Sequence, residues 1–392
     1  MLQTWRWFGP SDPVPLAHVR QAGAVGVVTA LHEVPCGDVW TLDAVMTRKA
    51  AIEAAGLVWS VVESIPIHEE IKLGSPDGRR YLAAYKDSLR SVAAAGVKIV
   101  CTNFMAITDW TRTDLEFPVG DGGTALRFDA VDFALYDLLV LKRPGAEADY
   151  APEQQAKAVA RLCAMSESDI ARLEANLIGW VPARDFIFDR ESFRRHLARY
   201  DGIGVEDFRA NFIAFLGEIA PIAAELGVRI AIHPDDPPWP LFGLPRVAST
   251  LADYQTFLAA VNEPGIGVTF CTGSFGARAD NDLPAMAEEL APRIHFVHLR
   301  NVRREEDGSF HEADHLGGDT DMVAVVMAIL REERRRRDAG RGDWELPFRP
   351  DHGHRILDDI GKRVNPGYSA IGRLKGLAEL RGIIRALEAV GY

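Results

Sequence analysis

The sequence is poor in three features that mark particular classes of protein. It has only four cysteines in 392 residues, widely spaced, which indicates reduced thiols and excludes a disulfide framework. No apolar run approaches the roughly 18 residues that span a bilayer, and the first residues are not those of a signal peptide. Lys and Arg number 44 against 56 Asp and Glu, and this net charge of −12 argues against a nucleic-acid partner. We therefore expect a cytoplasmic protein with no membrane or nucleic-acid partner.

One basic stretch stands out against this acidic background. Residues Arg331–Arg341 read REERRRRDAGR, continue a helical pattern and are flanked by acids. Charge runs of this kind usually lie on a solvated face. We expect an exposed helix end here and not an anion-binding site.

The sequence does contain a repeated unit of helix, glycine and strand. In four places an alanine-rich helix end is followed by a glycine and then by an apolar run; the glycines are Gly23, Gly56, Gly96 and Gly227. With looser repeats, eight strand candidates are centred near residues 6, 27, 60, 99, 230, 269, 296 and 348. Runs that are apolar on both faces are typical of parallel strands covered by helices. We predict an α/β fold, a (β/α)₈ TIM barrel formed by a single domain over residues 1–392. A doubly wound sheet is disfavoured because no glycine-rich phosphate loop follows the first strand.

The connection between the fourth and fifth strands is too long for a single helix. The segment from about 104 to 200 contains amphipathic helical patterns, and the stretch FPVGDGGTALRFDA within it is typical of a β-hairpin. Long insertions at the carboxyl ends of barrel strands build the face that carries the active site. We therefore predict a mainly helical insertion after strand four that lies over this face.

Four residues with strong metal-binding side chains fall at the ends of strands five to eight. They are His233, Cys271, His298 and Asp351. Imidazole, thiolate and carboxylate together suit manganese, iron(II), cobalt or zinc, whereas magnesium or calcium prefers oxygen ligands alone. Each residue by itself has a more ordinary structural interpretation, but four of them in register at adjacent strand ends predict a metal site.

Other histidines near these strands are expected to have different roles. His295 lies three residues before His298, and side chains an odd number apart along a strand point to opposite faces, so His295 should face the helix layer. His311 and His315 follow strand seven in the loop GSFHEADHLGGD, where a solvated position is the more common one. His354, in RPDHGH, is expected to support the site or the scaffold and not to react.

Two residues are candidates for moving protons. His352 follows Asp351 but leaves the strand in another direction, and a histidine beside a metal-bound substrate is the usual choice for a general base. Tyr368 lies on an Asn-Pro-Gly turn before the last helix and can protonate a leaving hydroxyl. The alternative for Tyr368 is a packing role at the rim of the pocket.

Several polar and aromatic residues near strand ends are candidates for binding substrate. We single out Arg6, Asn103, Trp110 and Arg300. Arginine binds carboxylates in a bidentate fashion, and the segment TNFMAITDWTRTDL after strand four mixes aromatic and cationic groups. These residues predict recognition of a polyhydroxylated anion.

With these residues, the sequence resembles the mannonate dehydratases of hexuronate catabolism, a family of metal-dependent barrels of the xylose-isomerase type. The likeness covers essentially the whole chain and includes TWRWFGP, AIHPDDPPWPLFGLPRV, TFCTGSFG, HFVHLRN, RPDHGH and NPGYSAIGRLKGLAELRG. The resemblance implies a Mn²⁺ or Fe²⁺ ion bound by His233, Cys271, His298 and Asp351. It also implies that His352 and Tyr368 form the catalytic pair.

The resemblance further implies a hydro-lyase that dehydrates D-mannonate, a sugar acid, to 2-dehydro-3-deoxy-D-gluconate by metal-assisted acid–base elimination. We assign His352 as the base and Tyr368 as the acid, and the reverse assignment stays open. Two alternatives also stay open: a metal-dependent sugar isomerase on the same barrel, and a non-catalytic sugar-acid-binding protein. Large acidic barrels commonly assemble, so we expect a homo-oligomer, a dimer or a tetramer.

Overall fold

The computed structural model describes residues 1–179 and 188–392 and contains a closed barrel of eight parallel strands. The barrel strands are β1 Leu2–Arg6, β2 Gly26–Thr29, β3 Val58–Glu63, β4 Ile99–Thr102, β7 Arg229–Ile232, β8 Ile266–Cys271, β9 Ile294–His298 and β12 Pro347–Arg349. Each coincides with one of the eight predicted strands. The strands follow one another around the barrel in chain order, and β12 closes the ring against β1. The predicted TIM barrel is confirmed.

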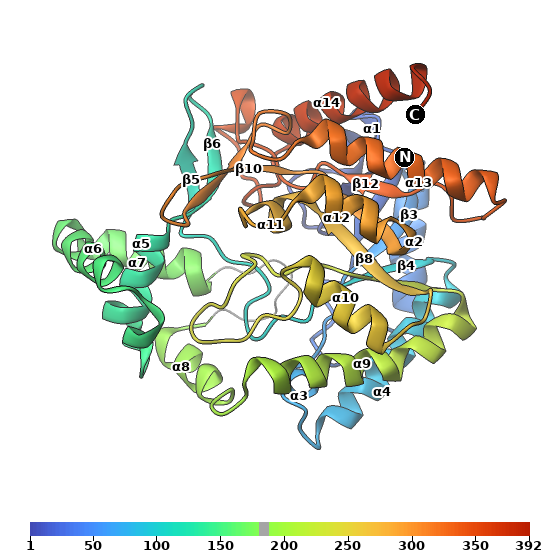
Figure 1. The fold of residues 1–392 in the computed structure, drawn as a ribbon. Coiled ribbons are helices and arrows are strands. Elements are labelled where there is room, and N and C mark those ends of the chain that lie inside the picture. The colour runs from blue at the N-terminus through green and yellow to red at the C-terminus, as the bar shows by residue number, and fades with distance from the viewer. Residues whose placement is uncertain (180–187) are drawn as a thin grey trace.

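Helices surround the barrel and connect successive strands (Figure 1). They are α1 Leu16–Gln21, α2 Leu42–Ala54, α3 Glu69–Lys72, α4 Gly78–Ala94, α9 Val205–Leu226, α10 Leu251–Ala260, α11 Thr272–Gly276, α12 Leu283–Leu290, α13 Met322–Asp338 and α14 Ala370–Ala389, with 3₁₀ turns η4 Ala291–Arg293 and η5 Leu357–Asp359. The helix ends follow the sequence chemistry. The side chains of Thr250 and Asp253 cap the start of α10 reciprocally, and Gly227 ends α9 in a left-handed conformation with φ of 60°.

The chain between β4 and β7 adds a hairpin and several helices. The hairpin consists of β5 Asp114–Pro118 and β6 Thr124–Phe128, which pair antiparallel as predicted. The helical elements are α5 Ala130–Leu135, η1 Tyr136–Leu141, η2 Ala146–Asp149, α6 Pro152–Ala164, α7 Glu167–Glu174, η3 Ala175–Gly179 and α8 Arg190–Ala198. Residues 180–187 of the predicted insertion lie outside the described part of the chain. In Figure 1 helices α5 to α8 lie at one side of the molecule, away from the two termini.

A second, four-stranded sheet joins this segment to the connection after β9. The connection forms β10 Asn301–Arg304 and β11 Phe310–Ala313, and the strand order is β10–β11–β6–β5. Strands β11 and β6 pair antiparallel through Phe310 and Phe128. Two loops from different parts of the barrel are thereby held together by backbone hydrogen bonds (Figure 1).

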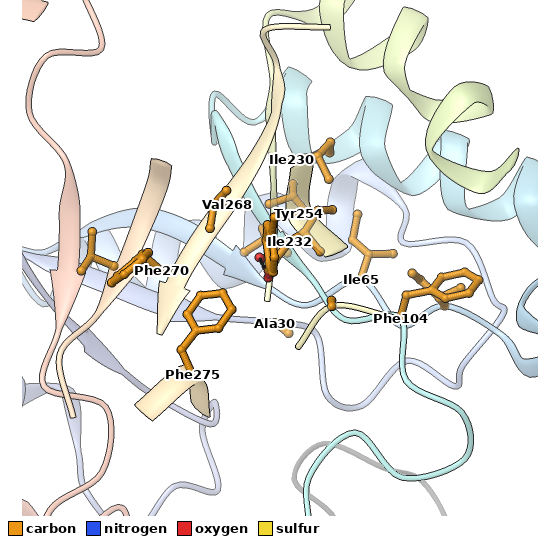
Figure 2. Packing of buried hydrophobic residues seen from close by; sticks show 14 of the residues in the cluster. Ala30, Ile65, Phe104, Ile230, Ile232, Tyr254, Val268, Phe270 and Phe275 are labelled. Carbon is orange, nitrogen blue, oxygen red and sulfur yellow. Dashed lines mark hydrogen bonds between the residues drawn. The ribbon is translucent and has the colours of Figure 1, made fainter. Parts of the chain in front are cut away.

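The hydrophobic core lies mainly between the barrel and the helices. Figure 2 shows apolar side chains of β7 and β8, including Ile230, Ile232 and Val268, in one cluster with Tyr254 of α10. The Tyr254 hydroxyl donates to the carbonyl oxygen of Ile232 at 3.0 Å, which satisfies its buried polar atom. A smaller cluster fills the barrel interior and consists of Val28, Val61, Ile99, Cys101, Ala231 and Phe296. Alternation along each strand therefore supplies two cores.

The basic run on α13 is exposed with one exception. Arg331, Arg334, Arg335 and Arg337 are exposed as expected. Arg336 is buried, and it donates to Glu332 and to the carbonyl oxygens of Ala291 and Ile294, the latter being the first residue of β9. The prediction of a fully solvated helix end is wrong at this position because Arg336 lies on the core-facing side of α13.

Within residues 1–179 and 188–392, no helix combines the length and the apolar character that a bilayer requires.

Candidate active site

Four side chains predicted as metal ligands lie at the carboxyl ends of four adjacent barrel strands. His233 directly follows β7, Cys271 and His298 end β8 and β9, and Asp351 lies two residues beyond β12. These strands are neighbours in the order β12–β9–β8–β7. The strand register pairs Cys271 with His298, so both reach the same level of the barrel. The structure thus brings the four residues to one rim.

The ligand atoms of His233, Cys271 and His298 all lie within 4.8 Å of one another, and Asp351 approaches two of these three residues. His233 Nε2 lies 3.2 Å from His298 Nδ1, and Asp351 Oδ2 lies 3.7 Å from Cys271 Sγ and 4.0 Å from His298 Nδ1. Metal–ligand bonds of about 2.0 to 2.3 Å place neighbouring ligands roughly 3 to 4.5 Å apart. His233 Nδ1 donates to the carbonyl oxygen of Pro234 at 2.7 Å, so its Nε2 faces the cluster. The residues fit a divalent transition metal.

The two anionic members of this set are ionised although they are buried. Burial opposes ionisation of the Cys271 thiol, but the Arg300 guanidinium and hydrogen bonds from histidines hold its pKa well below the usual value. Burial of Asp351 is likewise outweighed, above all by Arg349, and the pKa of this carboxyl is low. Burial also disfavours the charged form of His233, yet the thiolate raises its pKa to about 9. A cation at this rim meets two donors, Cys271 and Asp351, that are already negatively charged, whereas His233 must lose a proton to bind it.

Arg349 links this cluster to strand β3, which is not adjacent to β12 in the barrel, and sequence reasoning did not single it out. Its Nε donates to His298 Nε2 at 3.0 Å, its Nη2 donates to Glu63 at 2.8 Å, and its Nη1 bonds to Asp351. Glu63 ends β3 and also lies 3.4 Å from Arg6. The barrel register places Arg349 opposite His298. This buried network of charges orients two of the four ligands.

The predicted acid–base pair lies beside the cluster. The rings of His352 and Tyr368 are 4.8 Å apart and nearly perpendicular. The backbone segments that carry the two residues are joined next to them, because the N–H of Gly353 donates to the carbonyl oxygen of Gly367 at 2.8 Å. A side chain at Gly353 would meet the backbone of α14 at 2.4 Å, so only glycine permits this approach. Burial, with the nearby Asp351 carboxylate, raises the pKa of Tyr368 to about 12 although Arg349 lowers it, so the hydroxyl stays protonated at neutral pH.

Arg300, a predicted substrate-binding residue, is instead surrounded by carboxylates. It donates to Asp236 at 2.6 Å, lies 3.0 Å from Asp351, and bonds to Glu312. Arg112 donates to Asp236 as well, at 2.7 Å. Asp236, Glu312 and Arg112 are buried and were missed from the sequence, because nothing in their local patterns indicates that they meet. Arg300 does not belong to the described lining of the cavity, and its role in binding substrate stays a prediction.

A cavity of about 460 Å³ opens above the rim. Its lining includes the candidate catalytic residues His352 and Tyr368 and three of the predicted substrate-binding residues, Arg6, Asn103 and Trp110. Further lining residues come from the β3–α4 connection and from the segment around α8; they include His68, Glu69, Lys72, Phe188, His196 and Arg199. Segments from several strand ends therefore enclose one space large enough for a hexose-sized acid.

Two oxygen atoms of residues in the cavity lining have no hydrogen-bond donor among the described residues. They are Asn103 Oδ1 and Asp109 Oδ1, and both are buried. Ile107, between them, has a positive φ of 56°, which is strained for a β-branched residue. Such strain is found where a loop must aim side chains at a ligand. Both oxygens suit the hydroxyl groups of a polyol.

The four other histidines discussed from the sequence, His295, His311, His315 and His354, lie outside the cavity lining that the structure describes. His295 points into the helix layer, where its Nε2 lies 3.1 Å from the carbonyl oxygen of Pro264, as strand alternation predicted. His315 is buried, with Nε2 2.7 Å from the carbonyl oxygen of Pro350, so the expected solvated position is wrong. His311 is half-buried, and His354 Nε2 lies 2.9 Å from the backbone oxygen of Glu312.

Comparisons with known proteins relate the whole chain to one family. A family model described as D-mannonate dehydratase (UxuA) matches residues 1–391. The chain is 53% identical over 388 residues to mannonate dehydratase 2 of Agrobacterium fabrum, covering 99% of this chain and 98% of that protein. It is 53% identical over 390 residues to the mannonate dehydratase of Chromohalobacter salexigens, with 99% of each covered. The crystal structure of mannonate dehydratase from Streptococcus suis serotype 2 is 34% identical, with a TM-score of 0.77 over 100% of this chain and 95% of that chain.

Proposed function

The chain belongs to the D-mannonate dehydratase (UxuA) family, and we propose that it removes water from D-mannonate to give 2-dehydro-3-deoxy-D-gluconate at the rim described above. The observation that carries this proposal is that the candidate acid–base pair and the candidate metal ligands lie in the same cavity. His352 and Tyr368 line the same cavity as His233 and Asp351, which belong to the candidate metal cluster. A protein that only bound a sugar acid would need the cluster but not the acid–base pair.

The reaction needs one base and one acid. The hydrogen at C2 of the sugar acid is very weakly acidic, and the hydroxyl at C3 leaves only if it receives a proton. A bound divalent cation supplies positive charge that stabilises the anion formed next to the carboxylate and helps to hold the substrate. His352 takes the C2 proton and Tyr368 gives its proton to the departing C3 hydroxyl, which leaves as water. The protonated state of Tyr368 at neutral pH supports its role as the acid.

We assign the metal to a site formed by His233, Cys271, His298 and Asp351 and expect Mn²⁺ or Fe²⁺. The donor set of two imidazoles, a thiolate and a carboxylate supports a divalent transition metal. Such a mixed set binds several of these metals, so availability in the cell decides which one is loaded.

We further propose that Arg6, Asn103 and Trp110 contact the substrate, together with Asp109. The two unpartnered oxygens of Asn103 and Asp109 support this assignment because they need hydroxyl donors. Arg6 supplies positive charge in the same cavity. We propose that Arg300 acts from behind the cluster, because carboxylates already occupy its guanidinium group.

The test is a product assay on the purified, Mn²⁺-loaded protein. We expect a 2-keto-3-deoxy acid from D-mannonate and none from an aldose; absence of that acid would overturn the proposal, and aldose–ketose interconversion would favour the isomerase alternative. His352→Asn should keep its metal content and lose turnover, whereas loss of the metal would make His352 a ligand. His311→Asn, which removes a half-buried imidazole outside the described cavity lining, is the matched control and should keep the parent rate.

Two broader expectations stay predictions. We expect a cytoplasmic location, and this expectation rests on the sequence alone. The homo-oligomer, a dimer or a tetramer, can be tested by sedimentation of the purified protein.

A further inference from the structure

Glu312 is a buried carboxylate that reaches the site from outside the barrel. It lies on β11, in the hairpin that follows β9, and the residue is 3% exposed. The hairpin pairs Glu312 with Val302 and His311 with Arg303. Neighbouring residues of a strand point to opposite faces, and His311 packs near Phe117, with a ring separation of 5.3 Å. Glu312 therefore points inward, toward the barrel rim.

One oxygen of this carboxylate lies within hydrogen-bond distance of three nitrogens. His352 Nδ1 lies 2.7 Å from Glu312 Oε1, and Arg300 Nη1 bonds to the same oxygen. The two nitrogens are 3.3 Å apart because they share this acceptor. Arg112 Nη2 lies 3.5 Å from Oε1 as well. A carboxylate paired with guanidinium groups is ionised, so it only accepts hydrogen bonds, and His352 Nδ1 must be the donor.

A histidine whose Nδ1 carries the proton has its lone pair on Nε2. In this structure His352 Nε2 lies 3.8 Å from Asp351 Oδ1, on the side of the candidate metal cluster, and His352 lines the cavity. The nitrogen that can take a proton thus faces the place where substrate would bind. When it takes that proton, the neighbouring carboxylate stabilises the resulting imidazolium.

We propose that Glu312 is the positioning residue of the base: it holds the Nδ1–H of His352 so that Nε2 faces the substrate as a proton acceptor. This inference rests on the proposed function, because it assigns Glu312 a task in the same elimination. In the step itself, the C2–H bond of the substrate breaks, its electron pair stays on the substrate, and the proton forms a new bond to Nε2. Glu312 does not touch the substrate and exchanges no proton.

The competing explanation is that Glu312 only neutralises Arg300 and Arg112. That role would make the carboxylate important for stability, whereas a positioning role changes the rate and the tautomer of one histidine. The experiment must therefore separate kcat from folding and from metal binding.

The first test compares Glu312→Gln with the parent in the full-length, Mn²⁺-loaded protein. We expect kcat for D-mannonate to fall roughly 10- to 100-fold, as is usual when the partner of an oriented histidine is lost, while KM and the bound metal per chain stay within about twofold. Glu332→Gln is the matched control, because Glu332 is a buried carboxylate paired with Arg336 on α13, and it should keep the parent kcat. A parent kcat in Glu312→Gln would overturn the inference.

The second test reads the tautomer directly and needs no Glu312 variant. Nitrogen-15 NMR of histidine-labelled, Zn²⁺-loaded parent protein distinguishes Nδ1–H from Nε2–H, and the His352 signals are those missing from His352→Asn. We expect Nδ1–H; a dominant Nε2–H form would overturn the inference even if Glu312→Gln does not fold. If the parent produces no keto acid, the proposed function fails on its own, and the tautomer still decides the placement of the proton.

Discussion

His295 gives a prediction whose magnitude follows from the structure. This histidine is buried in β9, and burial together with Arg229 and Arg336 lowers its pKa to about 3. In the unfolded chain the pKa is about 6.5, so as the pH falls below that value the unfolded state binds a proton that the folded state does not. The free energy of unfolding therefore decreases with falling pH over the window from about 6.5 to 3. Between pH 7 and pH 5 this one group removes roughly 2 kcal/mol.

The substitution His295→Gln removes this titration and keeps a side-chain N–H for the carbonyl oxygen of Pro264. Urea unfolding followed by tryptophan fluorescence, with chelator present, gives the free energy of unfolding at pH 7 and at pH 5. We expect the loss between these two pH values to be about 2 kcal/mol smaller in the variant than in the parent. His18→Gln, which removes an exposed histidine on α1, is the matched control. An equal loss in His295→Gln and the parent would refute the reasoning.

Three further predictions concern the site and the core. Tyr368→Phe should lower kcat by about 10²- to 10⁴-fold without changing the melting temperature, because the ring still packs on Phe8 at a centroid distance of 4.7 Å. A parent rate in this variant would contradict the role of Tyr368 as the acid. Phe104→Ala should lower the free energy of unfolding in urea by about 3 to 5 kcal/mol, because Phe104 is buried against Phe212, and a change below about 1 kcal/mol would contradict that packing. Dialysis against a chelator should abolish turnover and lower the melting temperature, because the ion binds only the folded site, and added Mn²⁺ should restore both. Recovery of turnover with no added metal would contradict a metal-dependent reaction.

The barrel could be predicted from the sequence because its signals are local. A glycine in the left-handed backbone conformation ends a helix, and a strand that is apolar on both faces follows it. The four glycines Gly23, Gly56, Gly96 and Gly227 all have positive φ in the structure. The rule that strand ends meet at one rim then places the four candidate ligands together. The hairpin of β5 and β6 could also be predicted from the sequence, because glycines interrupt an alternating pattern there.

The residues that were missed depend on contacts between distant segments. Glu312 lies between His311 and His315, and choosing among the three requires the β10–β11 hairpin, whose register alone shows that Glu312 points inward. Asp236 pairs with Arg112, which is 124 positions away in the chain, so no local pattern connects them. Arg336 looked like its basic neighbours, but its position on α13 faces the core. In each case tertiary packing decides the role of a charged residue whose local sequence is unremarkable.

The most direct test of the central claim is deuterium exchange at C2 of D-mannonate in heavy water. The account predicts that Mn²⁺-loaded Tyr368→Phe still incorporates deuterium at C2, because His352 removes and returns the proton, while little keto acid forms. His352→Asn should incorporate none, with its metal content unchanged. Exchange that persists in His352→Asn and disappears in Tyr368→Phe would contradict the account and reverse the roles of base and acid.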